Sequence, residues 1–172
     1  MDSATIRRLL EELNEELCRQ GVVGEIGLCG GAVMCLVFNA RQATKDVEAV
    51  FAPAKELRAA AARVAERHDL PGDWLNDAAK GFFACDPPRQ NVMDLSHLRV
   101  WAPTAEYMLA MKCVSARFDS LDRDDVIFLI RHLGLRQPAQ VFQIIARFYP
   151  RQQVPPKTQF LVEEVLEQLG RH

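Results

Sequence analysis

Apolar residues recur at helical spacing at the start of the chain. Over residues 3–19 the apolar positions lie three or four apart: Ile6, Leu9, Leu10, Leu13 and Leu17. This spacing predicts an amphipathic helix that ends at Gly21. Further segments before residue 104 carry the patterns of strands (22–29, 46–51, 81–85, 98–101 and, more weakly, 92–95) and of helices (32–38 and 53–68).

The pattern changes after Pro103. Helical spacing of apolar positions then continues over residues 104–118, 122–133, 137–148 and 157–169. Strands with intervening helices therefore precede an all-helical region. We expect an α+β fold in which a small mixed sheet flanked by helices forms a core over residues 1–103, with residues 104–172 as a helical region packed on that core.

The composition is that of an ordinary globular protein. Of the 172 residues, 49% are hydrophobic and 26% are charged, which argues against intrinsic disorder. The 21 basic and 23 acidic residues give a formal net charge of −2, so binding of RNA or DNA would need a local basic patch.

Cysteine usage and hydropathy bear on location. The five cysteines never form a Cys-x-x-Cys pair, which argues against a zinc knuckle or a disulfide framework and favours a reducing cytoplasm. The most apolar run, residues 26–38, is interrupted by Gly30-Gly31 and falls short of the roughly 20 residues that span a bilayer. We therefore expect a cytoplasmic protein without membrane contact.

One constellation carries chemistry: a strand, Gly30-Gly31, a short helix opening at Ala32, and Asp46-Val47-Glu48 in the next strand. Side chains alternate along a strand, so Asp46 and Glu48 share a face and would repel each other there. A divalent metal such as Mg²⁺ removes that repulsion, and it prefers carboxylate and phosphate oxygens. The glycines allow close approach of a ligand, and the free N–H groups of a helix start attract an anion.

Each feature also has a plainer explanation. Most Gly-Gly pairs are only turns, and two acidic residues can lie on the solvated face of an edge strand. The combination of all of them in one strand–turn–helix–strand unit favours a site for a metal–triphosphate complex.

This combination resembles the polymerase-beta-type nucleotidyltransferase superfamily, and more closely its AbiEii-like and related uncharacterised branch. The matching positions are Gly30, Gly31, Arg41, Thr44, Asp46 and Glu48, then Lys112, Arg117, Asp122 and Asp125. Segments 73–77 and 148–150 are also similar to one uncharacterised branch. Two residues separate Arg41 from Thr44 where one is usual, and Glu48 stands where Asp is commoner.

The resemblance implies that a nucleotidyl group is transferred from a nucleoside triphosphate, bound with Mg²⁺ or Mn²⁺, to an RNA (for example tRNA) or a protein. It also implies a link to toxin–antitoxin systems and a cognate partner protein. Asp46 and Glu48 would hold the metal and act in catalysis with Lys112. The nucleotide-binding residues would be Gly30, Gly31, Ala32, Arg41, Thr44, Arg117 and Asp125. The alternative is a catalytically degenerate protein of this fold that binds a nucleotide or a partner.

Several of these residues have a second interpretation. Lys112 can be a surface lysine lying along an apolar stripe instead of a phosphate contact. Asp122 and Asp125 can be the N-cap and a first-turn acid of a helix, and the resemblance adds a polar link from Asp125 to Arg117 or Lys112. Asp94 is the best candidate for a third catalytic carboxylate, with a loop or turn residue as the alternative.

Overall fold

The computed structural model describes residues 1–115 and 120–170. The chain forms two compact units, one from residues 1–81 with 89–103 and the other from residues 82–88 with the chain from Thr104 onward. The first unit contains the sheet and the second is helical. None of the helices in the described ranges is both long and apolar enough to span a membrane.

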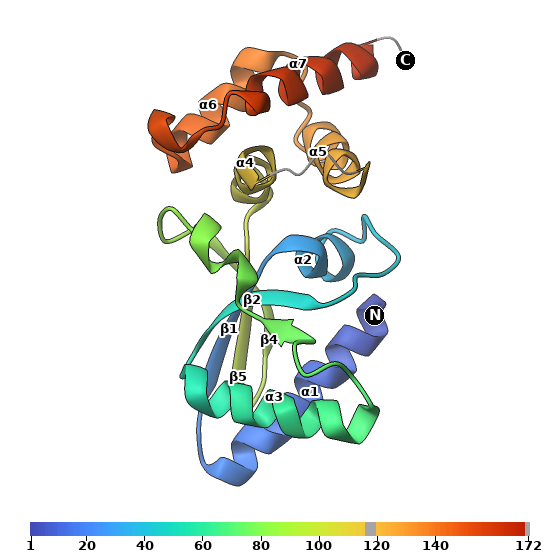
Figure 1. Ribbon diagram of the computed structural model, residues 1–172, viewed down its shortest axis with the longest axis vertical. Helices are drawn as coiled ribbons and strands as arrows, with labels where there is room; N and C mark the ends of the chain where they lie inside the picture. The colour runs from blue at the N-terminus through green and yellow to red at the C-terminus, as the bar shows by residue number, and fades with distance from the viewer. Residues whose placement is uncertain (116–119, 171–172) are drawn as a thin grey trace. The chain divides into compact units, whose positions relative to one another are not determined.

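The first unit is built on a five-stranded mixed sheet with strand order β3-β2-β1-β5-β4; four of its strands, β1, β2, β4 and β5, are labelled in Figure 1. The strands are β1 (Gly24–Leu28), β2 (Val47–Ala52), β3 (Leu75–Asn76), β4 (Arg89–Asp94) and β5 (Leu98–Pro103). β1 pairs parallel with β5 and antiparallel with β2. β2 pairs parallel with β3, and β4 pairs antiparallel with β5. The expected small mixed sheet with flanking helices is confirmed.

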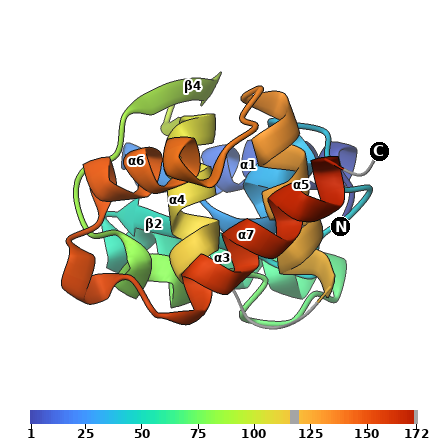
Figure 2. The ribbon, with the colours of Figure 1, turned by 90° about the horizontal axis from the view of Figure 1, so that it is seen from above.

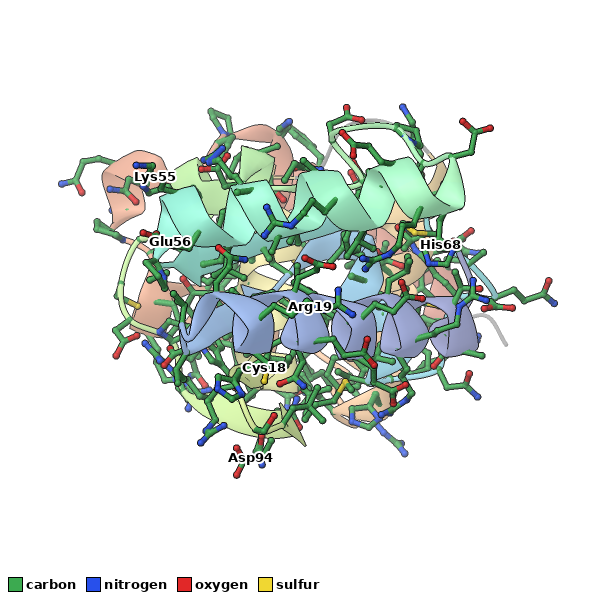
Figure 3. All side chains as sticks on the ribbon, turned by 90° about the horizontal axis from the view of Figure 1, so that it is seen from below. Cys18, Arg19, Lys55, Glu56, His68 and Asp94 are labelled. Atoms are coloured by element: carbon green, nitrogen blue, oxygen red, sulfur yellow. The ribbon has the colours of Figure 1, made fainter. Side chains whose placement is uncertain are left out.

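Two helices, α1 (Ser3–Gln20) and α3 (Ala54–His68), lie side by side on one face of this sheet (Figure 3). The carboxylate of Asp2 caps α1 by accepting the Thr5 N–H at 2.8 Å, and Gly21 ends it with φ +64°. The five apolar residues that predicted α1 are fully buried. They pack with apolar residues of the sheet and α3: Ile26, Leu28, Val47, Ala49, Leu57, Val64, Leu98 and Val100.

An ion-pair cluster joins α1 to α3 at their polar edges. Glu16 is buried, and its carboxylate accepts hydrogen bonds from Arg67, from Arg63 at 2.7 Å and from Arg19 at 2.5 Å. The hydrogen bond from Arg67, followed by the one from Arg63, lowers the pKa of Glu16 to about 2 against the effect of burial. The cluster therefore keeps Glu16 ionised between the two helices. Figure 3 shows Arg19 and His68 at this edge.

The second unit contains α4 (Ala105–Ser115), α5 (Ser120–His132), α6 (Pro138–Phe148) and α7 (Lys157–Gly170). Viewed from above, α6 and α7 lie over α4, with α5 beside it (Figure 2). Their shared core contains Tyr107, Leu109, Val126, Leu129, Val141, Val162 and Val165. The helical C-terminal region expected from the sequence is confirmed.

Residues 82–88 belong with these helices because two tyrosines hold them there. The Tyr149 hydroxyl donates to the Phe82 carbonyl at 2.5 Å, and the Tyr107 hydroxyl donates to the Cys85 carbonyl at 3.4 Å. The Phe83 ring stacks on Tyr107. The strand predicted over 81–85 is therefore wrong: Ala78–Phe82 forms a short 3-10 helix, and the residues after it are held by contacts with the tyrosines of the helical unit.

Candidate functional site

A tight turn at the end of β1 leads into α2 (Gly30–Leu36) and is tied to β2. The Cys29 N–H donates to the Glu48 carbonyl at 2.9 Å. Gly30 has φ +58°, in the left-handed region, and a Cβ there would lie 1.9 Å from Oε2 of Glu48. The Glu48 carboxylate thus lies directly over the α-carbon of Gly30, and only glycine leaves room for it.

The loop between α2 and β2 packs closely against Gly31, the second glycine of the turn. A Cβ on Gly31 would lie 2.5 Å from the Thr44 hydroxyl oxygen and 3.3 Å from Nη1 of Arg41. The Thr44 hydroxyl in turn donates to the Asp46 carbonyl at 3.2 Å. The two glycines, Arg41 and Thr44 are therefore neighbours, as the sequence motif required.

The helix start differs slightly from the expected one. α2 begins at Gly30, two residues before Ala32, so both glycines lie in its first turn, and Gly30, Gly31 and Ala32 are all buried. The side chain of the N-cap residue, Cys29, makes no capping hydrogen bond to this helix start. A residue without a polar side chain can take part in anion binding only through its backbone, so the contribution of Ala32 is limited to its N–H group.

Asp46 and Glu48 lie at the beginning of β2, on the side of the sheet away from the core. The intervening Val47 and the following Ala49 are fully buried, whereas both acidic residues are partly exposed. This alternation is the one that the sequence predicted. Asp46 precedes the first residue of β2, and Glu48 is the second residue.

Asn76 is a further polar residue at this edge of the sheet. It is the second residue of β3 and lies opposite Glu48 in the parallel pairing of β2 with β3. Its side-chain N–H₂ group donates to Oδ2 of Asp46 at 3.0 Å. Asn76 carries no motif that marks it in the sequence; the one signal is that it belongs to segment 73–77, which is similar to one uncharacterised branch.

Asp94 lies at the opposite end of the sheet from the glycine turn. Asp94 pairs with Arg99 of β5, and Arg99 pairs with Glu25 of β1. Glu25 precedes Cys29, at the glycine turn, by four residues, so about 13 Å of strand separates this end of the sheet from the turn. The Asp94 carboxylate pairs with Arg99 at 2.7 Å. The interpretation of Asp94 as a third carboxylate of the site is therefore wrong. Within residues 1–115 and 120–170 no group of three or more His, Cys, Asp or Glu residues could hold a metal ion.

Trp101 covers the middle of the same sheet face. A Cβ on Gly27 would lie 2.1 Å from the Trp101 ring, so the indole lies flat on the backbone of β1. The Arg89 guanidinium lies 4.2 Å from the ring centroid. The Glu25 carboxylate accepts from the indole N–H and pairs with Arg89, both at 2.8 Å. Trp101 is therefore packed in place and is only 8% exposed.

Lys112 and two aspartates form a buried ion-pair cluster in the helical unit. Lys112 Nζ lies 2.8 Å from Asp122 Oδ1 and 2.9 Å from Asp125 Oδ2, and the exposed fractions of Lys112 and Asp125 are 7% and 2%. Burial lowers the pKa of Lys112, but the charge of Asp125 and the hydrogen bond to Asp122 outweigh it, so the pKa is raised. Lys112 is thus a charged, buried residue instead of a surface lysine.

The two aspartates differ in their outcome. The polar link expected between Asp125 and Lys112 is confirmed. α5 begins at Ser120, so Asp122 lies within its first turn and is not the N-cap. Arg117 lies outside the described residues. Asp46 and Glu48 belong to the first unit, and Lys112 and Asp125 belong to the second.

Comparison with protein-family models, curated proteins and solved structures gives no match to this chain. The resemblance to polymerase-beta-type nucleotidyltransferases therefore stays a prediction from the sequence motif.

Proposed function

We propose that this chain is a nucleotidyltransferase that uses Mg²⁺ or Mn²⁺ and moves a nucleotidyl group from a nucleoside triphosphate to an RNA or protein acceptor. One observation carries the proposal. The carboxylate of Glu48 lies on the backbone of a left-handed glycine at a helix start, and the neighbouring carboxylate of Asp46 is fixed at the same strand end. This arrangement places acidic metal ligands beside backbone N–H groups that suit phosphate.

The donor atoms suit a hard divalent cation. Asp46 and Glu48 supply carboxylate oxygens, which Mg²⁺ and Mn²⁺ prefer, and Mg²⁺ in proteins usually takes one or two carboxylates together with substrate phosphates. The space left by the missing Cβ of Gly30 is filled by Oε2 of Glu48, so the chain itself sets where that ligand lies. Bound there, the cation would polarise the phosphoryl oxygens of the nucleotide.

The remaining residues of the turn have separate roles in this proposal. The N–H groups at the start of α2, from Gly30 to Ala32, bind phosphate oxygens, and Arg41 offsets their negative charge. Thr44 holds the loop, because its hydroxyl already donates to the carbonyl of Asp46. Lys112 is engaged by two carboxylates in the helical unit, so any contact of Lys112 with phosphate requires those ion pairs to open.

A second function, binding without catalysis, is favoured by one specific observation. Transfer to a hydroxyl acceptor needs a group that removes its proton, and a third carboxylate is the expected base. The candidate for that role, Asp94, is paired with Arg99 at the far end of the sheet. A protein that retains metal and nucleotide affinity as a sensor, or that serves a partner protein, would have no need of such a base.

The assignment of the acceptor depends on the family resemblance alone. RNA, in particular tRNA, and protein are both acceptors that the resemblance implies, as is a cognate partner in a toxin–antitoxin pair. The formal net charge of −2 means that an RNA acceptor would bind to a local basic patch.

The test is label transfer by the full chain. The protein is incubated with Mg²⁺ or Mn²⁺, total RNA, a protein extract and each nucleoside triphosphate carrying label at the α-phosphate, because only α-label follows the nucleotidyl group. Asp46→Asn is the site variant, and Asp94→Asn is the matched control on the same sheet. We expect transfer by the wild type and Asp94→Asn but not by Asp46→Asn. Transfer that persists in Asp46→Asn contradicts the catalytic assignment, and metal-dependent nucleotide binding without transfer supports the second function.

A further inference from the structure

Both ends of the Asn76 side-chain amide are occupied by defined partners. Its Nδ2 donates to Asp46 Oδ2 at 3.0 Å and to the Asp73 carbonyl at 3.2 Å. Its Oδ1 accepts the Ala78 N–H at 3.0 Å. Rotating the amide by 180° would place an acceptor against two acceptors and a donor against a donor, so the hydrogen-bond partners fix its orientation.

We infer that Asn76 is a positioning residue for the metal ligand Asp46, an inference that rests on the proposed function. The amide takes up Oδ2 of the carboxylate, while Oδ1 of Asp46 has no hydrogen-bond partner within the described ranges 1–115 and 120–170. Asn76 thus selects which oxygen of Asp46 remains for the cation and holds the plane of the carboxylate. Hydrogen bonds of this kind orient ligands in metal sites generally.

The backbone that carries Asn76 is itself held firmly. The Val47 N–H donates to the Trp74 carbonyl at 2.7 Å, which fixes β3 against the start of β2. The Trp74 ring is 1% exposed, and its indole N–H donates to the Ala61 carbonyl of α3 at 3.0 Å. β3 contains only two residues, yet these contacts anchor it to the sheet and to a helix. Asn76 can therefore hold Asp46 in one orientation.

A purely local role for Asn76 makes a different prediction. Its Oδ1 also forms a turn with the Ala78 N–H two residues later, and a serine at this position can form the equivalent turn. The serine hydroxyl is one bond shorter than the amide and does not reach Asp46. Asn76→Ser therefore retains the turn and removes the contact with Asp46, whereas Asn76→Ala removes both.

The experiment measures Mn²⁺ affinity of the full-length chain by titration, alone and with a non-hydrolysable ATP analogue. The variants are Asn76→Ala, Asn76→Ser and the control Asn14→Ala. The Asn14 side chain accepts a hydrogen bond from the His97 N–H at 2.7 Å, just before β5 and at the end of the sheet away from the glycine turn. Asn14→Ala therefore removes a comparable side-chain hydrogen bond away from the site. We expect both Asn76 variants to bind Mn²⁺ about 10-fold more weakly or worse, with metal-free analogue binding unchanged, and Asn14→Ala to match the wild type.

The outcomes separate this inference from the proposed function. Wild-type affinity for Mn²⁺ in Asn76→Ser overturns the inference alone, because the turn would then be the only role of Asn76. An absence of Mn²⁺ binding by the wild-type chain overturns the proposed function and the inference with it. Thermal unfolding without metal is measured for each variant. If Asn76→Ala does not fold, Asn76→Ser decides the result.

Discussion

Replacing Gly30 by alanine tests whether the position of the Glu48 carboxylate affects metal binding independently of the stability of the fold. Gly30 has φ +58°, where an alanine costs about 1 to 2 kcal/mol because its Cβ crowds the backbone. The new Cβ would also lie 1.9 Å from Oε2 of Glu48, the end of a flexible side chain. That oxygen must move by about 1.5 Å or more to reach ordinary van der Waals distance, which takes the carboxylate away from its present place.

A matched control exists in the same unit. Gly21 has φ +64°, and a Cβ there would have nothing within 4 Å. Gly21→Ala therefore carries the same backbone cost without displacing any side chain. We expect both variants to lose about 1 to 2 kcal/mol of unfolding free energy in denaturant titrations.

The two variants should differ in metal binding. Gly30→Ala moves one of two proposed ligands, so we expect its Mn²⁺ affinity to fall about 10-fold or more, whereas Gly21→Ala should bind as the wild type does. Wild-type Mn²⁺ affinity in Gly30→Ala refutes the reasoning about Glu48. An equal loss in Gly21→Ala would show that metal binding follows overall stability instead of ligand position.

Three further predictions concern stability. Lys112→Met should lower the unfolding free energy by about 3 to 5 kcal/mol in denaturant, because two carboxylates lose their buried cation; an unchanged value would contradict the ion-pair account. The ionised Glu16 carboxylate contributes its full stabilisation above its ordinary pKa of 4.5, and this stabilisation is lost as the pH falls toward 2. Glu16→Gln should therefore make the unfolding free energy less dependent on pH in that range. It should also lower the unfolding free energy by about 1 to 2 kcal/mol at neutral pH, after allowance for solvent screening. Gly27→Ala should lower the unfolding free energy by about 3 kcal/mol or more, because a Cβ would lie 2.1 Å from the Trp101 ring. Gly72→Ala, which has open space around it, should leave the unfolding free energy unchanged. Equal melting temperatures for the two variants would contradict this account of Trp101.

Much of the first unit could be predicted because local periodicity determines it. Apolar spacing predicted α1, and the helix propensity of an alanine-rich segment predicted α3, each to within two residues of its ends; period-two alternation placed Val47 inside and Glu48 outside. The neighbourhood of Gly30 and Glu48 also followed from the sequence, because a strand, a glycine turn and an antiparallel return strand bring those positions together.

Other features depend on long-range pairing that local patterns do not show. β3 has two residues and exists because Val47 bonds to Trp74, so neither it nor the contact of Asn76 with Asp46 could be predicted from local patterning. Asp94 looked suitable by residue type, but the antiparallel return of β4 places it at the wrong end of the sheet. Local patterning did not predict the burial of Lys112. A lysine is buried only where its charge is paired, and the two aspartates that pair with it lie ten or more residues further along the chain.

The most direct test of the proposed metal–nucleotide site is Mn²⁺-dependent binding of a nucleoside triphosphate, measured by titration of wild-type protein and of an Asp46→Asn/Glu48→Gln double variant that keeps side-chain size. We predict that Mn²⁺ strengthens nucleotide binding to the wild type and has no effect on binding to the double variant. Equal enhancement by Mn²⁺ in both proteins would contradict the assignment of Asp46 and Glu48 as the metal ligands.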